Sequence, residues 1–156
     1  MPTSPRAPWT IPLHDGPLAP WTDRAFALLF AGLAIAVVVL LAPVVPDARG
    51  HGTHEQLGMA PCSWPIDYHK PCPTCGCTTA ASLVVHGRLW AAIVTQPFGA
   101  VFTMALLLLG VHALCCLVAR RSFADLMVRL PFWRLVLFSV LLLLGSWGYL
   151  WWTWPG

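Results

Sequence analysis

Four of the six cysteines gather in a stretch of sixteen positions, at Cys62, Cys72, Cys75 and Cys77. Thiols that meet an oxidising compartment pair as disulfides, and four cysteines allow three pairings among which spacing does not choose. Cys72 and Cys75 also have the Cys-x-x-Cys spacing of a zinc knuckle, which Cys62 with His54 or His69 would complete as a tetrahedral site. The cluster is therefore a candidate for a disulfide or for a zinc-stabilised loop.

Thiol–disulfide exchange is a third chemistry for the same residues. The Cys72-Pro73-Thr74-Cys75 frame stands just before a helix that we expect to begin near Thr78. The positive end of a helix dipole favours thiolate, so Cys72 would act as the nucleophile and Cys75 as its resolving partner. A membrane thiol–disulfide oxidoreductase is thus the alternative function. A non-enzymatic structural or assembly component is favoured, because a single Cys-x-x-Cys is a weak signal for catalysis.

The apolar segments that flank the cysteine loop are expected to lie in a membrane. Apolar residues make up 58% of the 156 positions and charged residues only 10%, against about 25% in soluble domains. Three apolar stretches, 25–45, 98–119 and 135–154, have the roughly 20 residues that a spanning helix needs. Helix is the expected state because a lone strand would leave its backbone groups unpaired in lipid. The sequence predicts an all-α, polytopic membrane protein with three transmembrane helices.

The segments between the spans differ in composition. Residues 1–24 are Pro-rich and predict a cytoplasmic tail, whereas 46–97 forms the cysteine-containing loop. Up to Pro71 this loop shows no periodicity, but 80–86 and 88–96 predict two short interfacial helices bounded by Gly87. The sequence thus predicts that the cysteines lie in a loop that is followed by helices too short to span.

Charge sets the expected orientation. The loop 120–134 holds four arginines and one acid, and such loops remain in the cytoplasm. The N-terminus is then cytoplasmic, in agreement with Arg6 and Arg24, and the cysteine loop is extracytoplasmic. The tryptophans near the C-terminus are expected at the outer interface, where aromatic rings concentrate. We expect a multi-pass protein of a cell inner membrane.

The remaining partners are only broadly defined. Contact with anionic lipid is sufficient to explain the net charge of +3, and no run of basic residues suggests binding to nucleic acid. The sequence leaves open a membrane-protein partner or a homo-oligomer. His112, inside the second span, is either a hydrogen-bonded structural residue or a functional one.

The cysteine loop resembles the domain-of-unknown-function 2752 (DUF2752) family of small bacterial membrane proteins. The resemblance rests on His54, Gly58, Pro61-Cys62 and the run from Pro71 to Thr78, and it continues through His86-Gly87 and Pro97. Thr79 stands where the family usually has Arg, and Gln96 where it usually has Asn. The resemblance implies a membrane protein and singles out Cys62, Cys72 and Cys75, but it implies no reaction.

Overall fold

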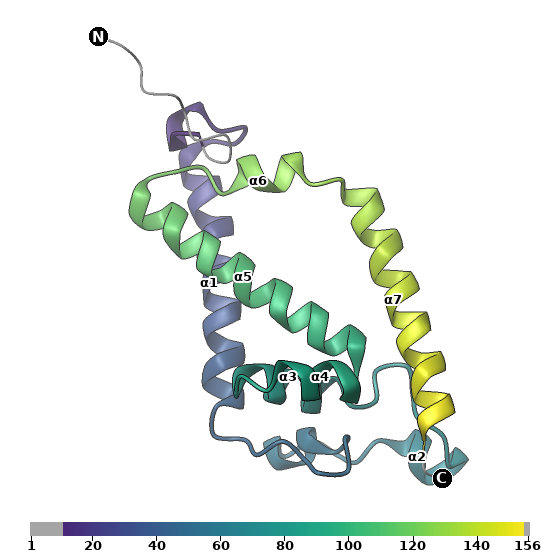
Figure 1. The fold of residues 1–156 in the computed structure, drawn as a ribbon. Helices are drawn as coiled ribbons and strands as arrows, with labels where there is room; N and C mark the ends of the chain where they lie inside the picture. The colour runs from purple at the N-terminus through teal and green to yellow at the C-terminus, as the bar shows by residue number, and fades with distance from the viewer. Residues whose placement is uncertain (1–10, 155–156) are drawn as a thin grey trace. The chain divides into compact units, whose positions relative to one another are not determined.

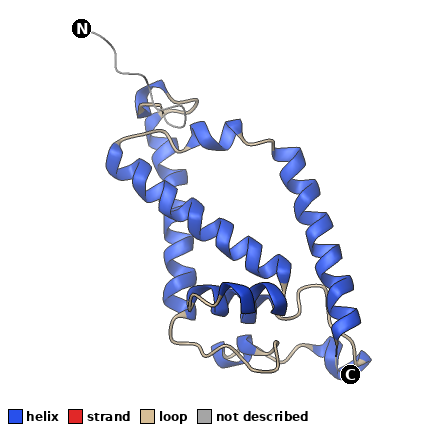
Figure 2. Ribbon diagram, in the orientation of Figure 1, coloured by secondary structure: helices blue, strands red, loops and turns tan. Residues whose placement is uncertain are grey.

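The computed structural model describes residues 11–154, and the regular elements in this part of the chain are all helices. The α-helices are α1 Pro20–Leu41, α2 Ser63–Tyr68, α3 Cys77–Val85, α4 Leu89–Thr95, α5 Pro97–Ala119, α6 Ala124–Arg129 and α7 Phe132–Thr153, and the 3-10 helices are η1 Leu13–Asp15 and η2 Thr53–Leu57. Figure 2 shows no strand in the described part of the chain. The expected all-α fold is confirmed.

Three helices are long and apolar enough to cross a bilayer: α1, α5 and α7, with 22, 23 and 22 residues. The multi-pass membrane assignment is therefore confirmed at this level. Proline opens both α1 and α5, because the first turn of a helix needs no N–H from its first residue. α1 begins at Pro20, five residues before the expected span, and ends at Leu41.

The shorter elements depart from the expected loop. α3 and α4 correspond to the two short helices expected at 80–86 and 88–96, whereas η2 and α2 lie in the part expected to be irregular. Of the expected tail at 1–24, residues 1–10, including Arg6, lie outside the described residues, and η1 and the start of α1 occupy the remainder. The cysteines are therefore carried on helix ends and turns.

The chain divides into two compact units, and the first comprises the described residues of 1–36 and 106–133. Its buried apolar cluster contains Ala27, Ala31, Ala113, Cys116 and Phe123. The carboxylate of Asp23, which is buried, accepts hydrogen bonds from the backbone N–H groups of Phe123 (2.9 Å) and Ala124 (3.3 Å) and from the Ser122 hydroxyl. Asp23 thus caps α6 from another helix, which explains why a charged residue is found inside α1.

The second unit comprises 37–105 and the described residues of 134–156, and it contains all four clustered cysteines. α3 packs against α4, beside which it is labelled in Figure 1, and also against η2. The Ser82 hydroxyl donates to the Val44 carbonyl at 2.9 Å, and the hydroxyls of Thr53 and Thr79 lie 2.8 Å apart. Buried hydroxyls pair in this way because an unpaired one would be costly. These bonds fasten α3 to the part of the chain that precedes the cysteines.

Candidate cysteine site

The turn from Cys72 to Gly76 sets up the start of α3. The Cys75 N–H donates to the Cys72 carbonyl at 3.0 Å, and Gly76 adopts a left-handed φ of 83° immediately before the helix. A Cβ atom on Gly76 would lie 2.7 Å from the Gly50 carbonyl oxygen. Glycine is needed here both for its backbone conformation and for this close approach. The Cys-Gly step of the motif is thus explained by packing.

Two side chains hold the backbone on either side of Cys72. The Trp147 indole N–H from α7 donates to the Pro71 carbonyl at 3.1 Å. The Gln96 amide donates to the Pro73 carbonyl at 3.4 Å, and its oxygen accepts from the Gly99 N–H at 2.7 Å. Gln96 is fully buried, so it joins the cysteine turn to the first turn of α5. The position of Cys72 is therefore fixed from two spanning helices.

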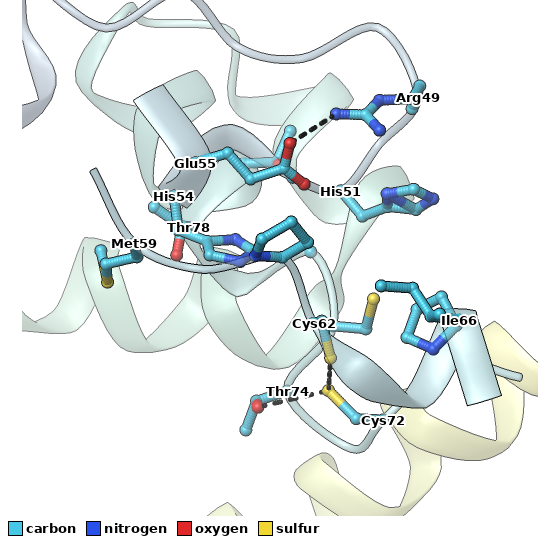
Figure 3. Close-up of a pocket in the computed structure, with 16 residues that line it drawn as sticks. Arg49, His51, His54, Glu55, Met59, Cys62, Ile66, Cys72, Thr74 and Thr78 are labelled. Carbon is cyan, nitrogen blue, oxygen red and sulfur yellow. Dashed lines mark hydrogen bonds and ion pairs between the residues drawn. The ribbon is translucent and has the colours of Figure 1, made fainter. Parts of the chain in front are cut away.

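The thiols of Cys62 and Cys72 are in contact. Cys62 directly precedes α2, and its Sγ atom lies 3.6 Å from Sγ of Cys72, as Figure 3 shows. The hydroxyl of Thr74 lies 3.7 Å from the Cys72 sulfur. Both cysteines are partly exposed. The fold thus brings the thiols of two residues ten positions apart in sequence into direct contact.

Cys75 and Cys77 occupy more enclosed positions. Burial raises the pKa of Cys75 to about 12, with smaller contributions from Cys72 and Cys62, and burial raises the pKa of Cys77 to about 11. Burial also raises the pKa of Cys62. A thiolate is the reactive form of cysteine, so Cys75 and Cys77 are held as unreactive thiols at neutral pH.

A pocket of about 540 Å³ adjoins the cysteines. Cys62, Cys72, Cys75 and His54 all line it, so the four expected site residues are brought together. Its walls also include apolar side chains, among them Met59 and Ile66, and charged residues that the sequence did not single out. An open apolar pocket with a few polar groups can accept a ligand or a partner side chain.

The polar side of the pocket is formed by Arg49, His51 and Glu55. The Arg49 guanidinium lies 2.8 Å from the carboxylate of Asp47 and 3.4 Å from that of Glu55 (Figure 3 shows the second pair). Its hydrogen bonds to Asp47 lower the pKa of that carboxyl and raise that of the arginine. Burial lowers the pKa of His51. The positive charge of Arg49 is thus already neutralised by Asp47 and Glu55, so the side chain shapes the pocket wall more than it supplies a free positive charge.

The residues considered for zinc share a pocket, but they are not arranged as a metal site. Within residues 11–154, no group of three or more His, Cys, Asp or Glu side chains has an arrangement that could hold a metal ion. The His54 ring nitrogen lies 3.2 Å from the Ala60 carbonyl oxygen, within hydrogen-bond distance. His112 belongs to the first unit, where its Nε2 lies 3.5 Å from Sγ of Cys116. The arrangement of the cluster therefore favours thiol–thiol chemistry.

Sequence reasoning missed several positioning residues. In the sequence, Gln96 is a departure from the family pattern and Trp147 is a membrane-interface aromatic, and neither indicates a contact with the cysteine turn. Thr79, which departs from the family pattern and is also a candidate helix cap, is instead buried and hydrogen-bonded to Thr53. None of these roles has a local sequence signal, because each depends on a partner far along the chain.

The described part of the chain is all-helical, it has three helices long and apolar enough to cross a membrane, and two of its thiols are in contact. Residues 68–110 match the family described as Protein of unknown function (DUF2752), which supports the resemblance indicated by the cysteine motif. The matched segment includes Cys72, Cys75, α3, α4 and the first half of α5. No curated protein and no solved structure matches the chain.

Proposed function

We propose that this protein is a structural or assembly component of a bacterial inner membrane, and that a Cys62–Cys72 disulfide holds its cysteine loop. The observation that supports the proposal is the 3.6 Å distance between the two Sγ atoms. A disulfide requires about 2.05 Å, so the sulfurs need to approach by about 1.5 Å. Rotation of two partly exposed side chains, with small backbone adjustment, supplies a movement of that size.

The energetic benefit follows from the length of the closed loop. The cross-link joins residues ten positions apart, so the ring contains eleven residues. Loop-closure entropy for such a ring corresponds to about 3 kcal/mol. α2 has no buried residue of its own, so a cross-link would stabilise a segment with little apolar core. This is the kind of segment in which disulfides replace hydrophobic burial.

The proposed orientation places this site outside the cytoplasm. Disulfides persist in oxidising compartments, and the arginine-rich segment 120–134 favours a cytoplasmic location for the loop after α5. An extracytoplasmic cysteine loop satisfies both conditions. A membrane-impermeant maleimide applied to intact cells with reduced protein should therefore label Cys72.

A thiol–disulfide oxidoreductase is the second candidate, because both thiols line an open pocket. The Cys72 thiolate would attack a substrate disulfide, forming a mixed disulfide and releasing one substrate thiol. The Cys62 thiolate would then attack the Cys72 sulfur, releasing the second substrate thiol and leaving Cys62–Cys72 oxidised. Cys62 serves better than Cys75 as the resolving residue, because its sulfur lies 3.6 Å from that of Cys72.

A redox titration separates the two functions. The purified protein would be equilibrated in dithiothreitol buffers of graded potential, then alkylated and analysed by mass spectrometry. A structural disulfide has a potential below about −300 mV, whereas a pair that exchanges with partners has a higher one. A low potential, together with poor accumulation of Cys62→Ser and Cys72→Ser in membranes, supports the structural role.

The exposed Cys115, which lies in the first unit, supplies the matched control as Cys115→Ser. This variant should accumulate normally and titrate as the wild type does. A high potential with normal accumulation of all three variants would instead establish the oxidoreductase. A Cys62–Cys72 pair that stays reduced at every potential would contradict both functions.

A further inference from the structure

The helix that follows Cys62 is joined to the end of α7 by aromatic contacts. The ring of Trp64 in α2 lies 6.2 Å from that of Trp147, edge to face, and Trp147 lies 6.1 Å from Trp151 in the same geometry. The Lys70 ammonium lies 5.3 Å from the centre of the Trp151 ring. Aromatic pairs and cation–π contacts at these distances are attractive. α2 and Lys70 are thus docked on the last turns of α7.

This assembly leaves a large apolar and aromatic surface uncovered. Ile66 is 62% exposed and Tyr68 66% exposed in α2, and Trp152 at the end of α7 is 91% exposed. Side chains of this size are seldom exposed together on a surface that faces only water. The uncovered side chains of Ile66, Tyr68 and Trp152, together with the partly exposed Lys70, are called the exposed surface of α2 and α7, and side chains of this kind require a partner other than water.

The depth of this surface follows from α7 itself. α7 is one of the three helices long enough to span, and its last residues are Trp151, Trp152 and Thr153. A 22-residue helix has a length of about 33 Å, which matches the roughly 30 Å hydrocarbon core, so its aromatic end lies at one interface. Trp and Tyr prefer that depth. Since α2 contacts this end, α2 lies at the same interface.

We infer that this surface binds the headgroup region of the phospholipid bilayer and so places Cys62 at the membrane–water interface. Ile66 and Tyr68 enter the upper acyl region, and Lys70 lies where it can meet lipid phosphates. Lipid is the occupant because α2 and Lys70 are docked on the end of a helix long enough to span a bilayer, and because the exposed residues combine aromatic rings with a cation. The inference does not depend on the redox state of the cysteines.

Photo-crosslinking tests this placement. Benzoylphenylalanine would replace Ile66 or Tyr68 in the full chain, held in nanodiscs of phosphatidylcholine and phosphatidylglycerol, and adducts would be identified by mass spectrometry. Position 152 serves as the membrane-depth reference, and Gln56, exposed in η2, as the matched control outside the surface.

The expected result is a lipid adduct at positions 66, 68 and 152 and none at position 56. Both 66 and 68 are mostly exposed in the structure, so the probe can be accommodated at either position. A lipid adduct at 152 alone would overturn the inference. A crosslink from 66 or 68 to another copy of the chain would also overturn it, and would assign the surface to self-association.

Discussion

Gln96 offers the sharpest test of how the cysteine turn is attached to the membrane helices. Its side-chain oxygen accepts from the Gly99 N–H at 2.7 Å, and its amide donates to the Pro73 carbonyl at 3.4 Å. Gln96→Ala removes both bonds inside a fully buried site. Gln96→Asn has a side chain one carbon shorter, which can still cap α5 but cannot span the distance to Pro73.

The expected costs differ between these variants. Loss of a helix cap costs about 1 kcal/mol, and a buried N–H left unpaired adds about 1–2 kcal/mol, so Gln96→Ala should destabilise the start of α5 by about 2–3 kcal/mol. Gln96→Asn loses only the longer bond, which contributes about 0.5–1 kcal/mol. The Gly99 amide should therefore exchange at least about 30-fold faster in Gln96→Ala, and less than about fivefold faster in Gln96→Asn.

Hydrogen exchange of residues 97–101 in detergent or nanodiscs, resolved by fragmentation, supplies the measurement. Ser146→Ala is the matched control, because Ser146 accepts instead from the neighbouring Phe98 N–H at 2.9 Å. That variant should accelerate exchange at Phe98 more than at Gly99. Equal effects of Gln96→Ala and Gln96→Asn at Gly99, or no effect of either, would refute the assigned capping role.

Three further predictions follow from other contacts. Gly76→Ala should lower the free energy of unfolding by about 2–4 kcal/mol in thermal unfolding, because the new Cβ atom combines a left-handed φ with a clash on the Gly50 carbonyl oxygen. The control Gly87→Ala has a φ of 72° but no neighbouring atom within 4 Å, so it should cost only about 1 kcal/mol. Alkylation of Cys75 in reduced protein should accelerate about tenfold per pH unit from pH 8 to 10, because this whole range lies below a thiol pKa of about 12. At neutral pH, such a pKa leaves about a thousandfold less thiolate than the ordinary value of 9.0. A rate that reaches a plateau near pH 9 would contradict this prediction. Asp23→Ala should cost about 2–4 kcal/mol and expose α6 to proteolysis, since it leaves buried donors unpaired, whereas the exposed Asp15→Ala should behave as wild type.

The spanning helices were predictable because the bilayer imposes their length and composition. The ends of these helices were harder to predict, since α1 starts at Pro20, five residues before the expected span, and includes Asp23. A carboxylate near a span normally indicates the aqueous side, but this one is buried against the N–H groups of α6. The start of α1 therefore depends on a partner a hundred residues away, which no local pattern reveals.

The sequence singled out residues that lie together in the structure but not how they are arranged, and their role as a site stays a prediction. The motif indicated Cys62, Cys72, Cys75 and His54, and all four line one pocket. Spacing drew attention to Cys72 and Cys75 as a pair, whereas the sulfur contact joins Cys72 to Cys62. α2, which positions Cys62, has only six residues and is docked through Trp64 on α7, so its helical state arises from tertiary contacts.

The central claim is that Cys62 and Cys72 are partners. The most direct measurement is disulfide mapping of protein purified without reductant, with free thiols blocked before proteolysis and the linked peptides identified by mass spectrometry. The account predicts one Cys62–Cys72 linkage, with Cys75 and Cys77 recovered as blocked free thiols. A linkage between Cys72 and Cys75, or four free thiols in protein isolated from an oxidising compartment, would contradict it.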